Sequence, residues 1–157
     1  MREQYNDDSL VEPFLDSREF HVGILGNGNP EILPPVEYDY SVFTDLHDRL
    51  YTYQWKYDGD SRGYKEIKLL CPLPAGDGLL VEKLKATALA AYKAFQLSDY
   101  GRIDLRMLGD EPQILDINPN PDIDYTSALM TSARACGLTY NQVVTRIVEL
   151  ASARMPG

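Results

Sequence analysis

Short apolar runs separated by turn residues occupy the first forty positions, a pattern typical of β-strands. Residues 10–15 and 19–25 mix β-branched and other apolar side chains, which predicts two strands joined by a turn at 16–18. The next segment, 26–30, is rich in glycine and asparagine but lacks the Gly-Lys-Ser/Thr ending of a phosphate loop, so it predicts a hairpin turn. Residues 36–38 predict another short strand.

The middle of the chain combines an irregular segment with a helical pattern. Residues 40–63 show neither the two-residue period of a strand nor the 3.6-residue period of a helix, and they carry several aromatic side chains among many charges. This pattern predicts a long loop, and such loops often take part in binding or catalysis. From Leu80 to about Phe95 apolar residues recur at steps of four, three and four, which predicts a helix. Its buried face is expected to carry Leu84, Ala88, Ala91 and Phe95.

Two further helices are predicted near the C-terminus. The first spans 126–136 and stops at Gly137, a residue type that often ends helices. The second opens with Thr139 and Gln142, which have the spacing of a capping box. Its inward face is expected to carry Val144, Ile147, Val148 and Ala151.

Residues 100–107 and 113–118 alternate apolar and polar side chains around a turn at 109–112, which predicts a β-hairpin. If the hairpin turns symmetrically about Asp110, four opposed pairs follow: Asp104 with Asp116, Arg102 with Asn118, Ile103 with Ile117, and Leu105 with Leu115. One face of the hairpin is then apolar and the other charged.

Two opposed carboxylates on that charged face repel unless a cation lies between them, because their Cβ atoms are about 4.5–5.5 Å apart. Carboxylate and amide oxygens suit magnesium, and a neighbouring arginine can contact phosphate. Two other interpretations stay open: the aspartates are solvated, or Asp104 is paired with Arg102 or Arg106. The prolines at 119 and 121 end the strand abruptly and hold Asn118 at its tip.

Length and composition predict one globular domain or a large part of one. Of 157 residues, 44% are hydrophobic and 25% charged, which argues against disorder, and no stretch has the apolar length of a membrane span. The formal net charge of −9 disfavours nucleic acids and anionic membranes as partners, because both would be repelled over most of the surface.

Residues 1–8 lack the apolar core of a signal peptide, which predicts a cytoplasmic protein. Cys71 and Cys136 have no Cys or His neighbours at zinc spacing, so buried free thiols are predicted in preference to a disulfide.

Several strings along nearly the whole chain occur in the order found in one enzyme family. They are VEPFL, REFHVGILG, LPPVE, YTYQWKY, CPLP, ALAAYKAF, YGRIDLR, ILDINPNP and GLTYNQVVTRIVELA. Each string is weak alone, but their joint order and spacing argue against chance similarity. In these strings the chain resembles the C-terminal portion of the D-alanine:D-alanine ligase group of ATP-grasp enzymes.

This resemblance implies a nucleotide site built from the first strands and the hairpin. Glu12 and the backbone around Phe14 and Leu15 would hold adenine, Glu19 would bind the ribose hydroxyls, and Leu115 would floor the adenine pocket.

It also implies residues for the phosphates and the second substrate. Lys56 would reach the ATP phosphates and Tyr57 would help to close the site. Arg102 would stabilise the transferring phosphoryl group and the tetrahedral intermediate. Asn120 and Ser127 would bind the second substrate, Ser127 through the substrate's carboxylate.

The metal ligands implied by the resemblance are Asp104, Asp116 and Asn118, which would hold magnesium or manganese. Three positions depart from the family. Asp116 is shorter than the family's glutamate and would hold a second metal more weakly or through water. Asp122 stands where glycine is usual and would crowd the carboxylate site of the second substrate, and Pro13 stands where lysine is common.

The implied fold is α+β, an ATP-grasp C-terminal lobe over residues 1–157 with a mainly antiparallel sheet, a long helix and two C-terminal helices. The implied chemistry joins an amino acid or similar carboxylate to an amine through an acyl phosphate made with ATP. Nothing in the chain resembles the N-terminal substrate domain or the central lobe, which would act in cis or in trans, or through a homodimer. A degenerate, non-catalytic lobe that binds nucleotide, metal or a protein stays an alternative, as does an unrelated α+β interaction domain.

Overall fold

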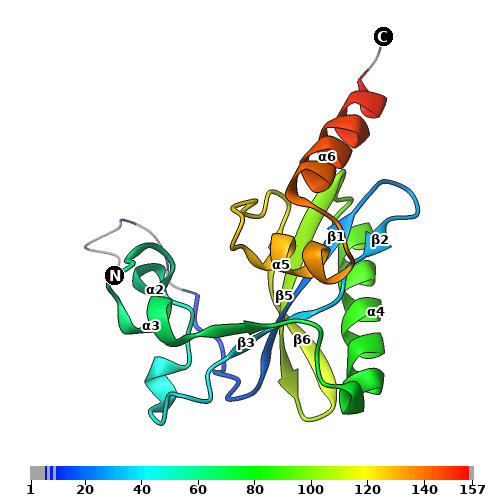
Figure 1. Cartoon of the computed structure of the whole chain (residues 1–157). Helices are drawn as coiled ribbons and strands as arrows, with labels where there is room; N and C mark the ends of the chain where they lie inside the picture. The colour runs from blue at the N-terminus through cyan, green and yellow to red at the C-terminus, as the bar shows by residue number, and fades with distance from the viewer. Residues whose placement is uncertain (1–5, 7, 9, 156–157) are drawn as a thin grey trace.

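An antiparallel sheet of six strands organises the protein (Figure 1). The computed structural model describes residues 6, 8 and 10–155, with Tyr57 described by its backbone alone. The strand order is β4-β3-β1-β5-β6, so β1 is central, and β2 pairs with the C-terminal end of β1. The strands are β1 (Glu19–Leu25), β2 (Glu31–Ile32), β3 (Val36–Asp39), β4 (Lys68–Leu70), β5 (Tyr100–Leu108) and β6 (Glu111–Asn118).

Helices cover the two faces of the sheet unequally. α4 (Gly78–Ala94) lies along one face. α5 (Ala128–Ala135) packs on the other face, where Leu129 closes against Gly23 of β1. α6 (Tyr140–Arg154) follows and extends away from the sheet (Figure 1). Much of the second face is therefore left for polar side chains.

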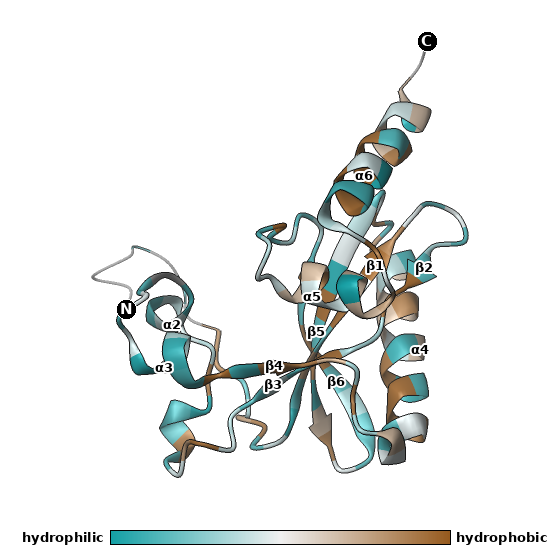
Figure 2. Cartoon of the chain, in the orientation of Figure 1, coloured by the Kyte–Doolittle hydropathy of each residue, from teal (hydrophilic) through white to brown (hydrophobic). Residues whose placement is uncertain are grey.

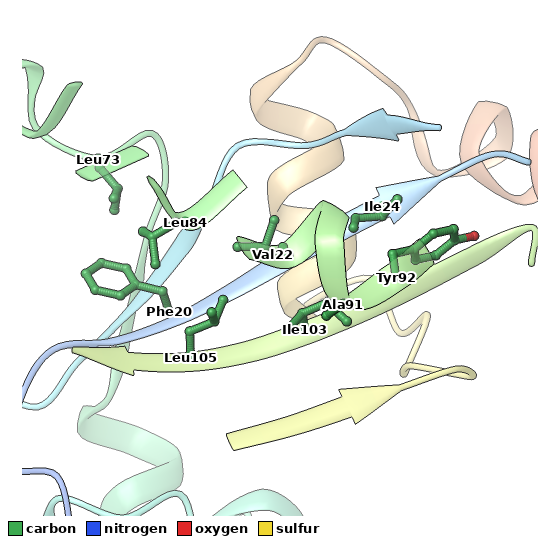
Figure 3. Packing of buried hydrophobic residues seen from close by; sticks show 10 residues of the cluster. Phe20, Val22, Ile24, Leu73, Leu84, Ala91, Tyr92, Ile103 and Leu105 are labelled. Carbon is green, nitrogen blue, oxygen red and sulfur yellow. The ribbon is translucent and has the colours of Figure 1, made fainter. Parts of the chain in front are cut away.

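The main core lies between α4 and the first face of the sheet. Side chains alternate across a strand, so Phe20, Val22 and Ile24 of β1 all point toward α4. Figure 3 shows them beside Ile103 and Leu105 of β5. Hydrophobic and hydrophilic residues interleave along α4, whose apolar positions face this core (Figure 2).

The strands at 19–25 and 36–38, the hairpin and the three long helices are confirmed. The capping box is also confirmed, with the Thr139 hydroxyl accepting from the backbone N–H of Gln142. α5 begins two residues later than predicted because Ser127 is its N-cap. Among the described residues no helix is both long and apolar enough to cross a membrane.

The predicted strand at 10–15 is wrong. Residues 10–16 have no regular structure, and Leu10 and Val11 are 84% and 88% exposed. Strand formation needs a neighbour to pair the backbone groups, and both edges of β1 are already occupied by β3 and β5. Residues 10–16 therefore cannot pair with β1, the strand that follows them, and no described strand pairs with them.

The predicted burial of four side chains is also wrong. Phe95 is 65% exposed because α4 ends at Ala94 and Phe95 is its C-cap. Val148 is 59% exposed, whereas Val143 is fully buried, because Val143 packs in the cluster with Leu25, Leu33 and Leu129 and Val148 does not belong to it. Both cysteines are free as predicted, but Cys136 is exposed and Cys71 is half-buried.

The segment 40–63, predicted as a loop, instead folds into a packed unit. It contains a 3-10 turn, η1 (Leu46–Asp48), and the helix α2 (Tyr53–Tyr57), and leads into α3 (Arg62–Glu66); a second 3-10 turn, η2 (Ala75–Asp77), precedes α4. Trp55 stacks on Phe43 with ring centroids 4.8 Å apart, next to the sheet residues Val36 and Tyr38. The loop prediction is wrong for this part of the segment because aromatic packing has no fixed sequence period that could be recognised in advance.

Gly63 of α3 permits this packing, because a Cβ there would lie 1.9 Å from Cδ2 of Trp55. We expect Gly63→Ala to displace the indole and lower the free energy of unfolding by about 1–3 kcal/mol, as overpacking does elsewhere. Gly76→Ala is the matched control, since a Cβ there meets nothing within 4 Å. Urea unfolding of both variants tests this, and equal stabilities would show that Trp55 is not confined by Gly63.

Candidate functional site

Charged side chains gather on the face of the sheet opposite α4. Arg102, Asp104 and Arg106 alternate with apolar residues along β5 and therefore share this face. In the register of β1 and β5, Glu19 lies opposite Arg106 and His21 lies opposite Asp104. All five side chains belong to buried residues, so each charge needs a partner.

Asp104 finds its partner on its own strand. Its Oδ1 accepts from Arg102 Nε at 2.7 Å and its Oδ2 accepts from Arg102 Nη2 at 2.8 Å. Burial opposes ionisation of Asp104, but the charges of His21 and Arg102 outweigh it and hold the pKa of Asp104 below its usual value. The pairing of Asp104 with Arg102, one of the interpretations left open by the sequence, is therefore present.

The hairpin register is confirmed where the predicted site lies and wrong beyond it. Asp104 opposes Asp116 and Arg102 opposes Asn118, as the symmetric turn predicts. An irregularity between Asp104 and Leu105 then shifts the ladder, so Leu105 pairs with Ile114 and not with Leu115. Such bulges place an extra residue on one strand, which no symmetric count of positions includes.

Asp116 is exposed, in contrast to Asp104. Its carboxylate accepts from the backbone N–H of Ile117 at 2.9 Å and from the Asn118 amide at 3.2 Å. No group of three or more His, Cys, Asp or Glu side chains suited to a metal occurs among the described residues. The available donors are thus two carboxylates and one amide, a set of hard oxygen ligands that suits magnesium with water completing its coordination.

Glu19 anchors a second buried ion pair. Its Oε2 accepts from Arg106 Nε at 3.0 Å, from Arg106 Nη2 at 2.9 Å, and from the Tyr40 hydroxyl at 3.2 Å. Burial disfavours the charged form, but hydrogen bonding from His21 and the charge of Arg106 more than offset it and lower the pKa of Glu19. The predicted contact of Glu19 with ribose stays a prediction.

Phe14 and Leu15 lie at the same end of the sheet. The guanidinium carbon of Arg106 is 5.0 Å from the centre of the Phe14 ring, and the carbonyl of Leu15 accepts from Arg106 at 2.6 Å. Arg106 thus brings Phe14, Leu15 and Glu19 together. Glu12 and Leu115, also predicted at the adenine, are exposed side chains.

An open pocket of about 930 Å³ lies beside the charged face. Five residues predicted from the sequence line it: Lys56, Arg102, Asn118, Asn120 and Ser127. They come from α2, from β5, from the end of β6 and from the N-cap of α5. Residues far apart in the sequence, predicted to act together, are therefore gathered at one cavity.

Other lining residues had no binding or catalytic role assigned from the sequence. Tyr38, Tyr51 and Tyr64 form aromatic walls, and Asp122 and Asp124 add two carboxylates. Asp122 had been expected to crowd the carboxylate site of the second substrate, and it does line the same pocket as Ser127. Tyr51 could have been found because it begins the string YTYQWKY, which also carries Lys56.

Ser127 and Asn120 already have partners. The Ser127 hydroxyl accepts from the backbone N–H of Met130, and Asn120 accepts from the Tyr100 hydroxyl. Lys56 is exposed, with its Nζ 5.3 Å from the centre of the Tyr51 ring. The Tyr57 side chain lies outside the described residues.

Similarity to known proteins identifies the family of this chain. The family model for the D-ala D-ala ligase C-terminus matches residues 2–149. The chain belongs to this family. It is 34% identical over 149 residues to a D-alanine--D-alanine ligase of Desulfovibrio desulfuricans, and 32% identical over 155 residues to an uncharacterized protein, y4sG, of Sinorhizobium fredii. These alignments cover 94% and 98% of the chain but only 44% of each relative.

Solved structures agree with this ATP-grasp ligase lobe. A D-alanine--D-alanine ligase of Bacillus anthracis complexed with ATP matches 89% of the chain at a TM-score of 0.67 and 19% identity, covering 40% of that structure. The VanG D-Ala:D-Ser ligase of Enterococcus faecalis matches 87% at a TM-score of 0.66 and 20% identity, covering 37%. These likenesses show a shared fold, and the α+β architecture predicted from the sequence is confirmed. The chain spans less than half the length of the relatives it matches.

The pair of Glu19 and Arg106 offers a test of the charged face. We expect Arg106→Leu to lower the free energy of unfolding at pH 7 by about 3–5 kcal/mol, because it removes the guanidinium partner of a buried carboxylate. The lowered pKa of Glu19 makes its stabilising contribution present at neutral pH and lost as pH falls through the folded-state pKa. The deficit of the variant should therefore shrink as pH falls below about 4, the ordinary range of a glutamate pKa.

Denaturant unfolding across this pH range measures the effect. Arg146→Leu is the control, because its partner Glu31 is 44% exposed and such pairs contribute at most about 1 kcal/mol. A pH-independent deficit in Arg106→Leu would contradict the ion-pair account.

Proposed function

We propose that this chain is the ATP- and magnesium-binding lobe of a ligase that joins a carboxylate to an amine through an acyl phosphate. The observation that carries the proposal is the gathering of Lys56, Arg102, Asn118, Asn120 and Ser127 at one pocket. Family membership supports it, as does the ATP named with the B. anthracis structure.

The cations of the pocket match the charge of nucleotide phosphates. Lys56 and Arg102 come from different elements and line the same cavity, so a phosphate chain there can be contacted from two sides. Positive groups fixed before the reaction stabilise charge that develops on a transferring phosphoryl group. Lys56 supplies a mobile charge, whereas Arg102 is held in place by Asp104.

Asp104, Asp116 and Asn118 are the residues that would hold magnesium or manganese. The register places Asp104 across from Asp116, and Asn118 follows on the same face of β6. Bound magnesium would neutralise phosphate oxygens and orient them for transfer. The donor chemistry fits, provided that Arg102 releases the Asp104 carboxylate.

When Arg102 releases Asp104, each of the two residues exchanges its partner for a new one of opposite charge. In the ligand-free protein, Arg102 and Asp104 neutralise each other within the sheet face. A phosphate offers Arg102 a new anion, and a metal ion offers Asp104 a new cation. Breaking a buried pair without replacement is strongly destabilising, so the two exchanges must occur together. Nucleotide and metal binding should therefore be coupled.

Asp122 bears on the identity of the second substrate. It lines the pocket together with Ser127, the residue predicted to bind a substrate carboxylate. Among the described residues no basic side chain lies within 4 Å of Asp122, so its charge is uncompensated by an ion pair. A free carboxylate next to it would be repelled, which disfavours a simple amino acid as the amine donor in that position.

One observation favours the alternative of a non-catalytic binding module. The Arg102 and Asp104 pair is already satisfied without ligand, as in a purely structural ion pair. The two functions predict different responses to magnesium, because only the ligase lobe requires metal-coupled nucleotide binding.

Calorimetric titration of the chain with ATP tests this coupling. We expect magnesium to increase ATP affinity, and Asp104→Asn to reduce that increase on the order of tenfold, or about 1.4 kcal/mol. Asp110→Asn is the matched control: it removes the same charge from the exposed turn of the same hairpin. Full magnesium-coupled binding in Asp104→Asn would overturn the metal assignment, and metal-independent binding in the wild type would favour the non-catalytic module.

A further inference from the structure

Nδ1 of His21 is a buried side-chain nitrogen without a hydrogen-bond partner among the described residues. The ring is 3% exposed, so bulk solvent does not reach this atom. Such unpaired buried groups are uncommon and call for a physical explanation. The sequence assigned no role to His21.

The imidazole ring is held on two sides. Its Nε2 lies 3.1 Å from Glu19 Oε1, and Glu19 is fixed in turn by Arg106. Its face packs on Tyr38 with ring centroids 4.1 Å apart. The orientation of the ring is therefore set before any ligand binds.

This orientation directs Nδ1 toward Asp104. The distance from Nδ1 to Asp104 Oδ1 is 3.5 Å, just beyond an ordinary hydrogen bond. Oδ1 is the same oxygen that accepts from Arg102 Nε at 2.7 Å. Among the described residues, no basic side chain other than Arg102 and His21 lies within 4 Å of this carboxylate. The two donors thus face one acceptor atom.

We propose that His21 is a positioning residue that takes over Asp104 when Arg102 turns to the nucleotide phosphates. This inference rests on the proposed function. Because Nε2 faces the Glu19 carboxylate and needs its own proton there, this takeover uses the doubly protonated ring, in which Nδ1–H donates to Asp104 Oδ1 and leaves Oδ2 directed toward the metal. Glu19, His21 and Asp104 form a continuous chain from the predicted ribose site to the predicted metal site. Outer-shell partners of this kind orient ligating carboxylates in metal sites.

The first test requires no ligand. The chain has two histidines, His21 and His47, so a nitrogen-15 spectrum of the imidazole rings of the full chain resolves both. We expect Arg102→Gln to shift the His21 Nδ1 signal toward that of a hydrogen-bonded N–H. His47, which is 85% exposed, is the internal reference. An unchanged His21 signal in this variant would overturn the takeover.

The second test uses magnesium-coupled ATP binding. We expect His21→Phe, which retains a ring for Tyr38, to reduce the magnesium-dependent gain in ATP affinity about tenfold while metal-free ATP affinity stays within about twofold. His47→Phe is the matched control and should leave both values unchanged. If magnesium-coupled binding exists in the wild type and His21→Phe leaves it intact, the proposed function stands and the role of His21 fails.

Amide substitutions separate positioning from simple packing. The asparagine amide nitrogen reaches the place of Nδ1, whereas the glutamine amide nitrogen reaches the place of Nε2. We therefore expect His21→Asn to recover the magnesium-dependent gain and His21→Gln not to recover it. The reverse order would show that His21 acts only through Glu19. Thermal unfolding of each variant confirms that the comparison is made on folded protein.

Discussion

Charges buried on one face of a sheet must be paired, and this requirement organises the site. α4 covers the opposite face, so the main hydrophobic core forms on that side and the charged side chains collect on this one. Arg102 pairs with Asp104 and Arg106 pairs with Glu19, each through short hydrogen bonds. Removing either member of a pair would strongly destabilise the fold, because an unpaired buried charge costs far more free energy than a paired one. A ligand can open the site only by supplying replacement charges.

Much of the fold followed from the sequence because its signals are periodic. The alternation along β5 and β6 placed Asp104 opposite Asp116, and the three-four spacing located α4. The prediction that the site binds ATP came from the family resemblance, because periodicity does not identify a ligand. Features that depend on contacts with distant residues were predicted wrongly. Residues 10–15 pair with no described strand, so they do not form the predicted strand. The bulge after Asp104 shifts the ladder, so Leu115 does not pair with Leu105.

The site was only partly accessible to sequence reasoning for a related physical reason. Lys56 and Ser127 were placed by resemblance, and the structure brings both to one pocket. His21 was missed because a single histidine in a strand carries no spacing signal. Its significance comes from Glu19, two residues away on the same strand, and from Asp104, which lies across the ladder on a distant segment. Residues 40–63 were predicted as a loop but contain α2, because Trp55 stacks on Phe43 and packs this segment against the sheet.

The central claim is that the partner of Asp104 changes from Arg102 to a metal ion when nucleotide binds. A crystal structure of the chain with manganese and a non-hydrolysable ATP analogue tests this most directly, because manganese is located by its anomalous scattering. The account predicts a manganese peak bound by Asp104 and Asp116, with Arg102 contacting phosphate. An intact Arg102 to Asp104 pair, with manganese bound elsewhere or only to phosphate, would contradict it.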